Sequence, residues 1–154
     1  MIEQLLEKKI VDALADALGD ADIQVMGAWQ PATDGEVKSL EDGKASGYLA
    51  VRMQPRTYET PTIPTAQIPC TIGLVMRAEV DTDGQSYLAV TSAVSDVLQS
   101  WQNSIEAATT AFDIDGKFSC AGFQLTGGDA GIDKAKKVWT WAQSLIVYGV
   151  IQPQ

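Results

Sequence analysis

The chain has 154 residues, of which 45% are hydrophobic, so it is long enough for one domain with a buried core. It carries 20 acidic and 11 basic side chains and a net charge of −9, which argues against binding to nucleic-acid phosphates or anionic lipid. Histidine is absent, which excludes a Ser-His-Asp triad, a Cys-His pair and a zinc site with imidazole ligands.

The N-terminal segment is predicted to form an amphipathic helix over residues 2–18, because apolar side chains recur there at three- and four-residue spacing. Glu3 and Glu7 are placed on its polar, solvent-facing side. Residues 23–29 then alternate with a period of two, which is typical of a half-buried strand. Residues 30–47 are polar and contain two Asp-Gly pairs, so a long exposed loop is expected there.

The middle of the chain is predicted to contain two strands separated by a loop. Residues 47–54 form the first strand, and Pro55 ends it because proline cannot donate to a ladder. Residues 55–69 hold four of the six prolines and are expected to be an extended, poorly paired loop. Residues 70–81 alternate clearly between apolar and other positions, which predicts the second strand.

The C-terminal half is predicted to contain a helix over residues 86–104, followed by strands. The Asp-Gly pair at 115–116 is flanked by alternating apolar residues and indicates a hairpin turn, with a return strand over 118–125. Residues 126–137 begin with a glycine-rich run and are expected to form a flexible loop. Residues 138–151 form a long apolar strand that contains two tryptophans.

This order of elements predicts one α+β domain over residues 1–154, with a mostly antiparallel sheet and two helices packed on one face. No segment approaches the roughly 18 apolar residues of a membrane span. The first residues lack the basic start and apolar core of a signal peptide, so a soluble, intracellular product is expected.

The two cysteines, Cys70 and Cys120, lie fifty residues apart in apolar, strand-like runs, so no CxxC redox pair exists. We expect two buried thiols in a reducing compartment, with a disulfide between them as the alternative.

Paired carboxylates are the one catalytic resource of the chain. Asp113 and Asp115 lie two apart beside the predicted turn and would point to one face, where they could bind a divalent ion or share a proton. Aspartate is also common beside tight turns for conformational reasons. Since no serine, cysteine or lysine stands beside an activating base, we expect no catalytic residue, no metal and no cofactor.

Three passages resemble the tail terminator proteins of long-tailed bacteriophages. The first is the helix over 2–18 followed by a short strand. The second runs from 48–53 through a long loop to the strand 74–80 and the helix that ends at residue 98. The third is the run Gly-Asp-Ala-Gly before the tryptophan-bearing strand 138–150.

The resemblance implies a non-enzymatic structural protein with a tail-terminator-like fold. Such a protein would form a ring, hexameric in this family, that caps the tail tube and joins it to the head or neck. Its partners would be copies of itself, the tail tube protein and the head–tail connector. DNA would pass through the lumen without specific binding, because an acidic wall repels phosphate. The protein would be assembled in the host cytoplasm and reside in the virion.

The subunit contact is expected on exposed strand edges and on the proline-rich segment 55–69. A second contact, with the tube or neck, is expected on residues 127–137. Each of these positions can equally be an ordinary exposed loop without a partner. Because Arg56 and Tyr58 lie in a predicted loop, replacing both by alanine is expected to leave the fold intact but to weaken assembly. The candidate contact residues are Arg52, Arg56, Tyr58, Glu59, Lys134, Lys136 and Lys137.

Two alternatives remain open. The chain could be another neck or tail-assembly protein of a phage, including a chaperone that stays monomeric. It could instead be a small ligand-binding or metal-assisted hydrolytic domain that uses Asp113 and Asp115. Uptake of metal by the monomer would favour the second alternative.

Overall fold

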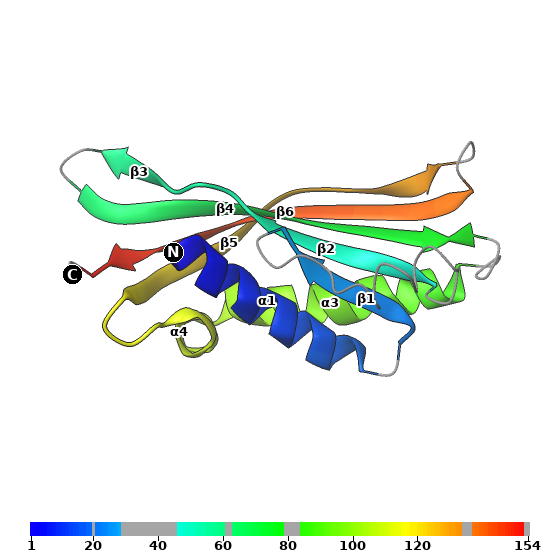
Figure 1. Cartoon of the computed structure of the whole chain (residues 1–154), viewed down its shortest axis with the longest axis horizontal. Helices are drawn as coiled ribbons and strands as arrows, with labels where there is room; N and C mark the ends of the chain where they lie inside the picture. Colours follow the sequence, from blue (N-terminus) through cyan, green and yellow to red (C-terminus); the bar gives the residue numbers. More distant parts are fainter. Residues whose placement is uncertain (20, 29–45, 61–62, 79–83, 134–136, 153–154) are drawn as a thin grey trace.

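A computed structural model describes residues 1–19, 21–28, 46–60, 63–78, 84–133 and 137–152. In this part of the chain, a sheet of six strands is covered on one face by three helices (Figure 1). The α+β class and the mostly antiparallel sheet agree with the prediction, which expected two helices. The elements are α1 (Ile2–Leu18), β1 (Ile23–Gly27), β2 (Gly47–Met53), β3 (Thr57–Thr60), β4 (Ile63–Arg77), α3 (Gln85–Asn103), α4 (Ile105–Phe112), β5 (Phe118–Asp133) and β6 (Val138–Ile151).

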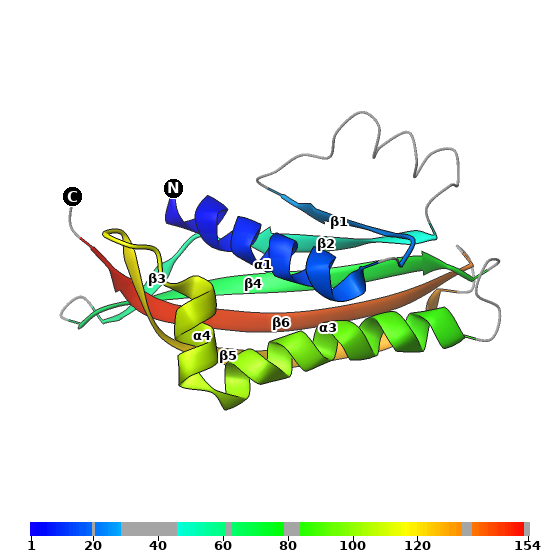
Figure 2. The ribbon, with the colours of Figure 1, turned by 90° about the horizontal axis from the view of Figure 1, so that it is seen from below.

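The sheet is built around two long central strands, β4 and β6, which pair antiparallel over thirteen residue pairs. The strand order is β1-β2-β4-β6-β5, and β3 pairs with β4 outside this path. The pairing of β1 with β2 is parallel, whereas every other pairing is antiparallel. Strands β3 and β2 follow one another along the same edge of β4. Figure 2 shows α1 and α3 running along the sheet and α4 turned across its end.

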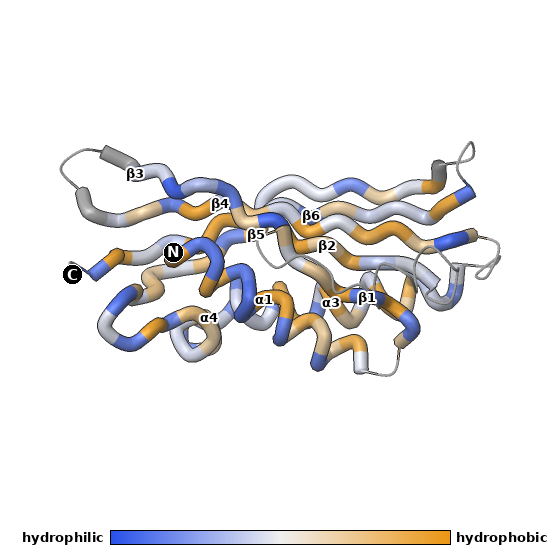
Figure 3. Tube along the Cα trace, in the orientation of Figure 1, coloured by the Kyte–Doolittle hydropathy of each residue, from blue (hydrophilic) through white to orange (hydrophobic). Residues whose placement is uncertain are grey.

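The core lies between the sheet and the helices. The side chains that face the core alternate along the strands and recur at helical spacing along α1 and α3. Figure 3 shows how hydrophobic and hydrophilic residues alternate along the chain. Full burial of one such side chain stabilises the fold by roughly 1.5–3 kcal/mol. Residues fully buried here include Leu6, Ile10, Leu14, Leu49, Val51, Ile68, Ile72, Val94 and Val147. Trp101, Phe112 and Phe123 form an aromatic cluster with ring centroids 4.8 to 5.7 Å apart.

Helix α4 was not predicted, although its start carries a clear signal. Ser104 has an extended backbone, and its hydroxyl accepts a hydrogen bond from the backbone N–H of Ala107 at 3.1 Å. This is the N-cap arrangement that begins a helix. Phe112 therefore ends a helix instead of forming the first arm of a hairpin. The predicted turn at 115–116 is present, with Gly116 at φ 72°.

Most of the described residues of the proline-rich segment 55–69 lie in strands, which corrects the prediction of a loop. It contains β3 and the first part of β4. Along β4, the residues that pair with β3 end at Gln67, and the residues that pair with β2 begin at Cys70. Pro69 lies between these two points, and its carbonyl faces that edge and accepts a hydrogen bond from Gln54 N–H at 2.8 Å. The missing N–H of proline thus falls where β4 changes neighbours, beyond the last residue pair of the ladder with β2.

The glycine-rich segment is likewise not a loop. Strand β5 continues through it to Asp133 and pairs with β6, with register shifts after Cys120 and after Leu125. The predicted loop at 126–137 is therefore wrong for its first eight residues. Most of the predicted loop 30–47, and Lys134 and Lys136, lie outside the described residues.

The two cysteines are free thiols. Cys70 pairs with Leu145 of β6, and Cys120 pairs with Gly149 on the opposite side of the same strand. A whole strand therefore separates them, which places their Cα atoms about 10 Å apart or more. A disulfide requires a Cα separation under about 7 Å, so the disulfide alternative is excluded in this fold.

Candidate functional site

Two glutamates of α1 face the sheet instead of solvent, which corrects the prediction for both. Glu3 and Glu7 are 4% and 0% exposed. Glu7 Oε2 accepts a hydrogen bond from Met53 N–H at 3.1 Å, at the end of β2, just beyond the point where β1 stops. Glu3 accepts hydrogen bonds from Arg56, three residues further on. One turn of α1 therefore satisfies backbone groups that no neighbouring strand reaches.

The contact between Glu3 and Arg56 is an ion pair with three donors on one carboxylate. Arg56 donates from its backbone N–H at 3.2 Å, from Nε at 3.0 Å and from Nη2 at 2.7 Å. Burial alone would raise the pKa of Glu3, but the hydrogen bonds from Arg56 outweigh it and hold the pKa below its usual value. The hydrogen bond to Glu3 raises the pKa of Arg56 above its usual value. The pair is therefore fully ionised at neutral pH.

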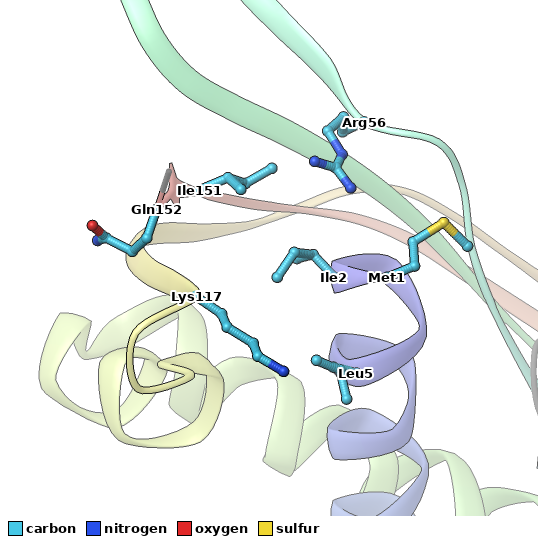
Figure 4. Close-up of a pocket in the computed structure, with 7 residues that line it drawn as sticks. All are labelled: Met1, Ile2, Leu5, Arg56, Lys117, Ile151 and Gln152. Atoms are coloured by element: carbon cyan, nitrogen blue, oxygen red, sulfur yellow. The ribbon is translucent and has the colours of Figure 1, made fainter. Parts of the chain in front are cut away.

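A hollow of about 260 Å³ lies beside this pair, at the N-terminal end of α1 (Figure 4). Its floor is apolar, and its two charged side chains are the cations Arg56 and Lys117. It is lined by Met1, Ile2, Leu5, Arg56, Lys117, Ile151 and Gln152. A second hollow, of about 360 Å³, lies where β1 stops and contains Arg52. Both linings combine cationic and apolar side chains, a composition that can hold part of a ligand or partner.

The predicted contact residues divide into two places. Arg52 is exposed on β2, Tyr58 is 51% exposed on β3, and Glu59 also lies on β3, so these three follow one edge of the sheet. Arg56 is close to them, but its guanidinium is committed to Glu3. Lys137 is exposed at the start of β6, where its carbonyl accepts a hydrogen bond from Ala78 N–H, at the other end of the sheet.

The two carboxylates that could bind a metal, Asp113 and Asp115, have different surroundings. Asp113 follows the last residue of α4, and its Oδ1 accepts a hydrogen bond from Cys120 N–H at 2.6 Å, so its role is structural. Asp115 stands in the turn and is exposed. Within the described residues, no group of three or more metal-ligating side chains is assembled. No helix there is long and apolar enough to span a membrane.

Sequence reasoning missed the outer edge of β5, whose two halves differ. In the first half, three backbone N–H groups that point away from β6 are satisfied within the chain. Phe118 donates to Ile114 O at 2.9 Å, Cys120 to Asp113, and Leu125 to Gln102 Oε1 at 2.6 Å.

In the second half of β5, residues 126–132 are all exposed. The one side-chain hydrogen bond found for a backbone N–H in this described segment is that from Ala130 to Oδ1 of its neighbour Asp129. The first half of the edge is closed by other elements of the chain, and the second half is open. The glycines of this segment are typical of a loop, so the sequence did not indicate an edge strand there.

Comparisons with known proteins define the fold. No family model matches the chain, and no curated protein matches it. A chain in the virion of a native gene transfer agent particle has a similar fold, with a TM-score of 0.51 and 16% sequence identity. The match covers 89% of this chain and 84% of that chain. The protein therefore has an α+β fold that is also found in a virion component.

Two further solved structures, both from Akkermansia muciniphila, are more distant. One, determined without its transmembrane region, has a TM-score of 0.38, 15% identity and coverage of 99% of this chain and 86% of that chain. The other has a TM-score of 0.40, 15% identity and coverage of 99% and 78%. Neither score is high enough to bear on the fold.

Proposed function

We propose that this chain is a structural protein of a phage-type virion, and specifically a tail terminator. In this role it forms a hexameric ring that caps the tail tube and joins it to the head or neck. The observation that carries the proposal is the fold shared with a virion chain over 89% of the residues. The resemblance of three sequence passages to tail terminators points to the same class.

The surface of the described residues supports a role in assembly. The two hollows combine a cation with apolar side chains, which is a composition suited to contacts with another protein. Exposed apolar side chains, among them Tyr58 and Ile132, lie on edge strands at opposite sides of the sheet. A ring requires two different surfaces on each subunit, and opposite sheet edges provide them.

The charge of the chain fits the proposed position on the path of DNA. At −9, the protein repels phosphate, so DNA would pass through a ring of such subunits without being held. The partners in this proposal are further copies of the chain, the tail tube protein and the head–tail connector. The virion is the proposed location.

The test is the state of the purified protein, measured by light scattering and negative-stain electron microscopy over a range of concentrations. Six copies of 16.5 kDa give a ring of about 99 kDa. Closed rings are the expected result. A chain that stays monomeric at its highest soluble concentration would contradict self-assembly, and would favour the tail-assembly chaperone instead.

A further inference from the structure

The two edge strands β1 and β5 lie on opposite sides of the sheet, at the same position along the strand direction. Following the pairings across all strands, each residue of β1 falls in one row with one residue of the open half of β5. The row that begins at Ile23 contains Gly47, Met76, Trp139 and Ile132, and the row that begins at Gly27 contains Val51, Ile72, Gln143 and Gly128. The five residues 23–27 thus correspond to residues 132–128, row by row.

The directions of these two strands also match. Between β1 and β5 lie one parallel and three antiparallel pairings, so β1 runs antiparallel to β5. If a second copy stands beside the first in the same orientation, its β1 meets the β5 of the first copy as an antiparallel strand. Antiparallel pairing of extended strands needs no crossover connection and forms backbone hydrogen bonds along both edges.

The open half of β5 has few of the features that protect edge strands. Natural edges are usually blocked by lysine, proline or a covering element. Residues 126–132 contain neither lysine nor proline, and Asp129 is their one charge. The five residues of β1 carry no charge at all, so no like-charged side chains oppose the pairing.

We propose that residues 128–132 of β5 pair with β1 of a second copy of this chain, which extends the five rows of the sheet from one subunit to the next. The contact joins two different edges, so it is heterologous and closes into a ring when repeated by rotation. The inference rests on the proposed function in that it names the subunit contact of the proposed ring. In this pairing, the N–H of Ala130 exchanges its hydrogen bond to Asp129 for a hydrogen bond to the partner strand.

The first test removes one backbone donor from the open edge. Ala130→Pro deletes the N–H that donates to Asp129 and leaves the ladder with β6 intact, because that N–H points away from β6. Ala130→Gly keeps the donor and serves as the matched control. We expect Ala130→Pro to weaken self-association at least tenfold by light scattering, and Ala130→Gly to assemble like the unchanged chain. Circular dichroism checks that both variants fold.

The second test uses disulfide cross-linking and does not depend on the proline variant. Val25→Cys and Ala130→Cys are placed in separate chains in which Cys120→Ser removes the half-buried thiol. After mixing and mild oxidation, cross-linked dimers are expected in the mixture and not with either chain alone. Ala121→Cys is the matched control, because Ala121 is exposed on the closed half of β5 and should give no product with Val25→Cys.

The outcomes separate this inference from the proposed function. Rings that persist in a folded Ala130→Pro variant, without cross-linking between positions 25 and 130, overturn the strand pairing and leave the ring intact. Cross-linking of Ala130→Cys with itself overturns the pairing in favour of a symmetric β5–β5 dimer. Open filaments joined by the 25–130 link support the pairing and contradict the ring. A strictly monomeric chain contradicts both.

Discussion

Glu3 and Arg56, which lie 53 residues apart in the sequence, form an ion pair in which the guanidinium donates to both carboxylate oxygens. The carboxylate is almost completely buried, whereas the guanidinium retains 28% of its side-chain exposure. The contact ties the first turn of α1 to the link between β2 and β3. It also uses Nε and Nη2 of Arg56 for a contact within the chain.

Replacing Arg56 by alanine should therefore destabilise the monomer, contrary to the expectation from the loop placement. The buried carboxylate of Glu3 would lose both guanidinium hydrogen bonds, a loss of about 1–3 kcal/mol. Arg52→Ala, which removes an exposed arginine of β2, should change the free energy of unfolding by less than about 0.5 kcal/mol. Urea unfolding of both variants measures the difference. Equal stabilities would show that the ion pair does not contribute.

The same pair makes stability depend on pH in the acid range. The pKa of Glu3 is lower in the folded protein than its ordinary value of 4.5. Its contribution is fully present above pH 4.5 and is lost as the pH falls through the folded pKa, because the unfolded chain takes up the proton first. Glu3→Gln should be less stable at pH 7 and should lose less stability between pH 5 and pH 3. Parallel acid-titration curves for the two proteins would contradict this assignment.

The two thiols should differ in reactivity. Burial raises the pKa of Cys70 to about 12, and burial also raises the pKa of the half-buried Cys120. Because the thiolate is the reactive form, Cys70 should resist a thiol reagent at pH 8 until the protein unfolds, and Cys120 should react slowly. Labelling followed by mass spectrometry, with and without denaturant, measures both. Rapid modification of Cys70 in the folded protein would be inconsistent with its position in the core.

A methyl group at Gly27 should destabilise the protein, since a Cβ there would overlap the carboxylate of Glu7. The carboxylate also accepts the hydrogen bond from Met53, so it cannot move away freely. Gly27→Ala should cost about 1–3 kcal/mol, as overpacking in a core does. Gly131→Ala is the control, because its Cβ would meet no atom, and it should leave the stability unchanged or raise it slightly. Denaturant midpoints of the two variants decide the matter.

The strongly periodic segments were predictable from the sequence. Helices α1 and α3 and strand β6 carry long apolar patterns, and the structure has them within one or two residues of their predicted bounds. The prolines and glycines were misleading. Pro69 is accommodated because β4 changes neighbours at that residue, and this depends on the ends of two other strands. The sequence around Pro69 does not indicate that β4 changes neighbours there.

The burial of two carboxylates was also beyond sequence reasoning. Glu3 and Glu7 lie next to the apolar stripe of α1, at positions that are commonly exposed in an isolated helix. They are buried because β1 stops at Gly27 and leaves backbone donors near Met53 and Arg56 that need acceptors. The strand end and the helix face meet only in the folded chain. The spacing of the two glutamates, four residues apart, was the available signal.

Strand β6 is the last element in chain order, yet it lies between β4 and β5, inside the sheet. Its pairing with β4 joins Thr65 to Val150, a separation of 85 positions. During synthesis on a ribosome, β4 and β5 therefore lack the strand that pairs with both of them until β6 emerges. Contacts of such long range slow folding and leave the edges of β4 and β5 that face β6 unpaired in the meantime. The sheet described here is thus completed only after β6 has been made.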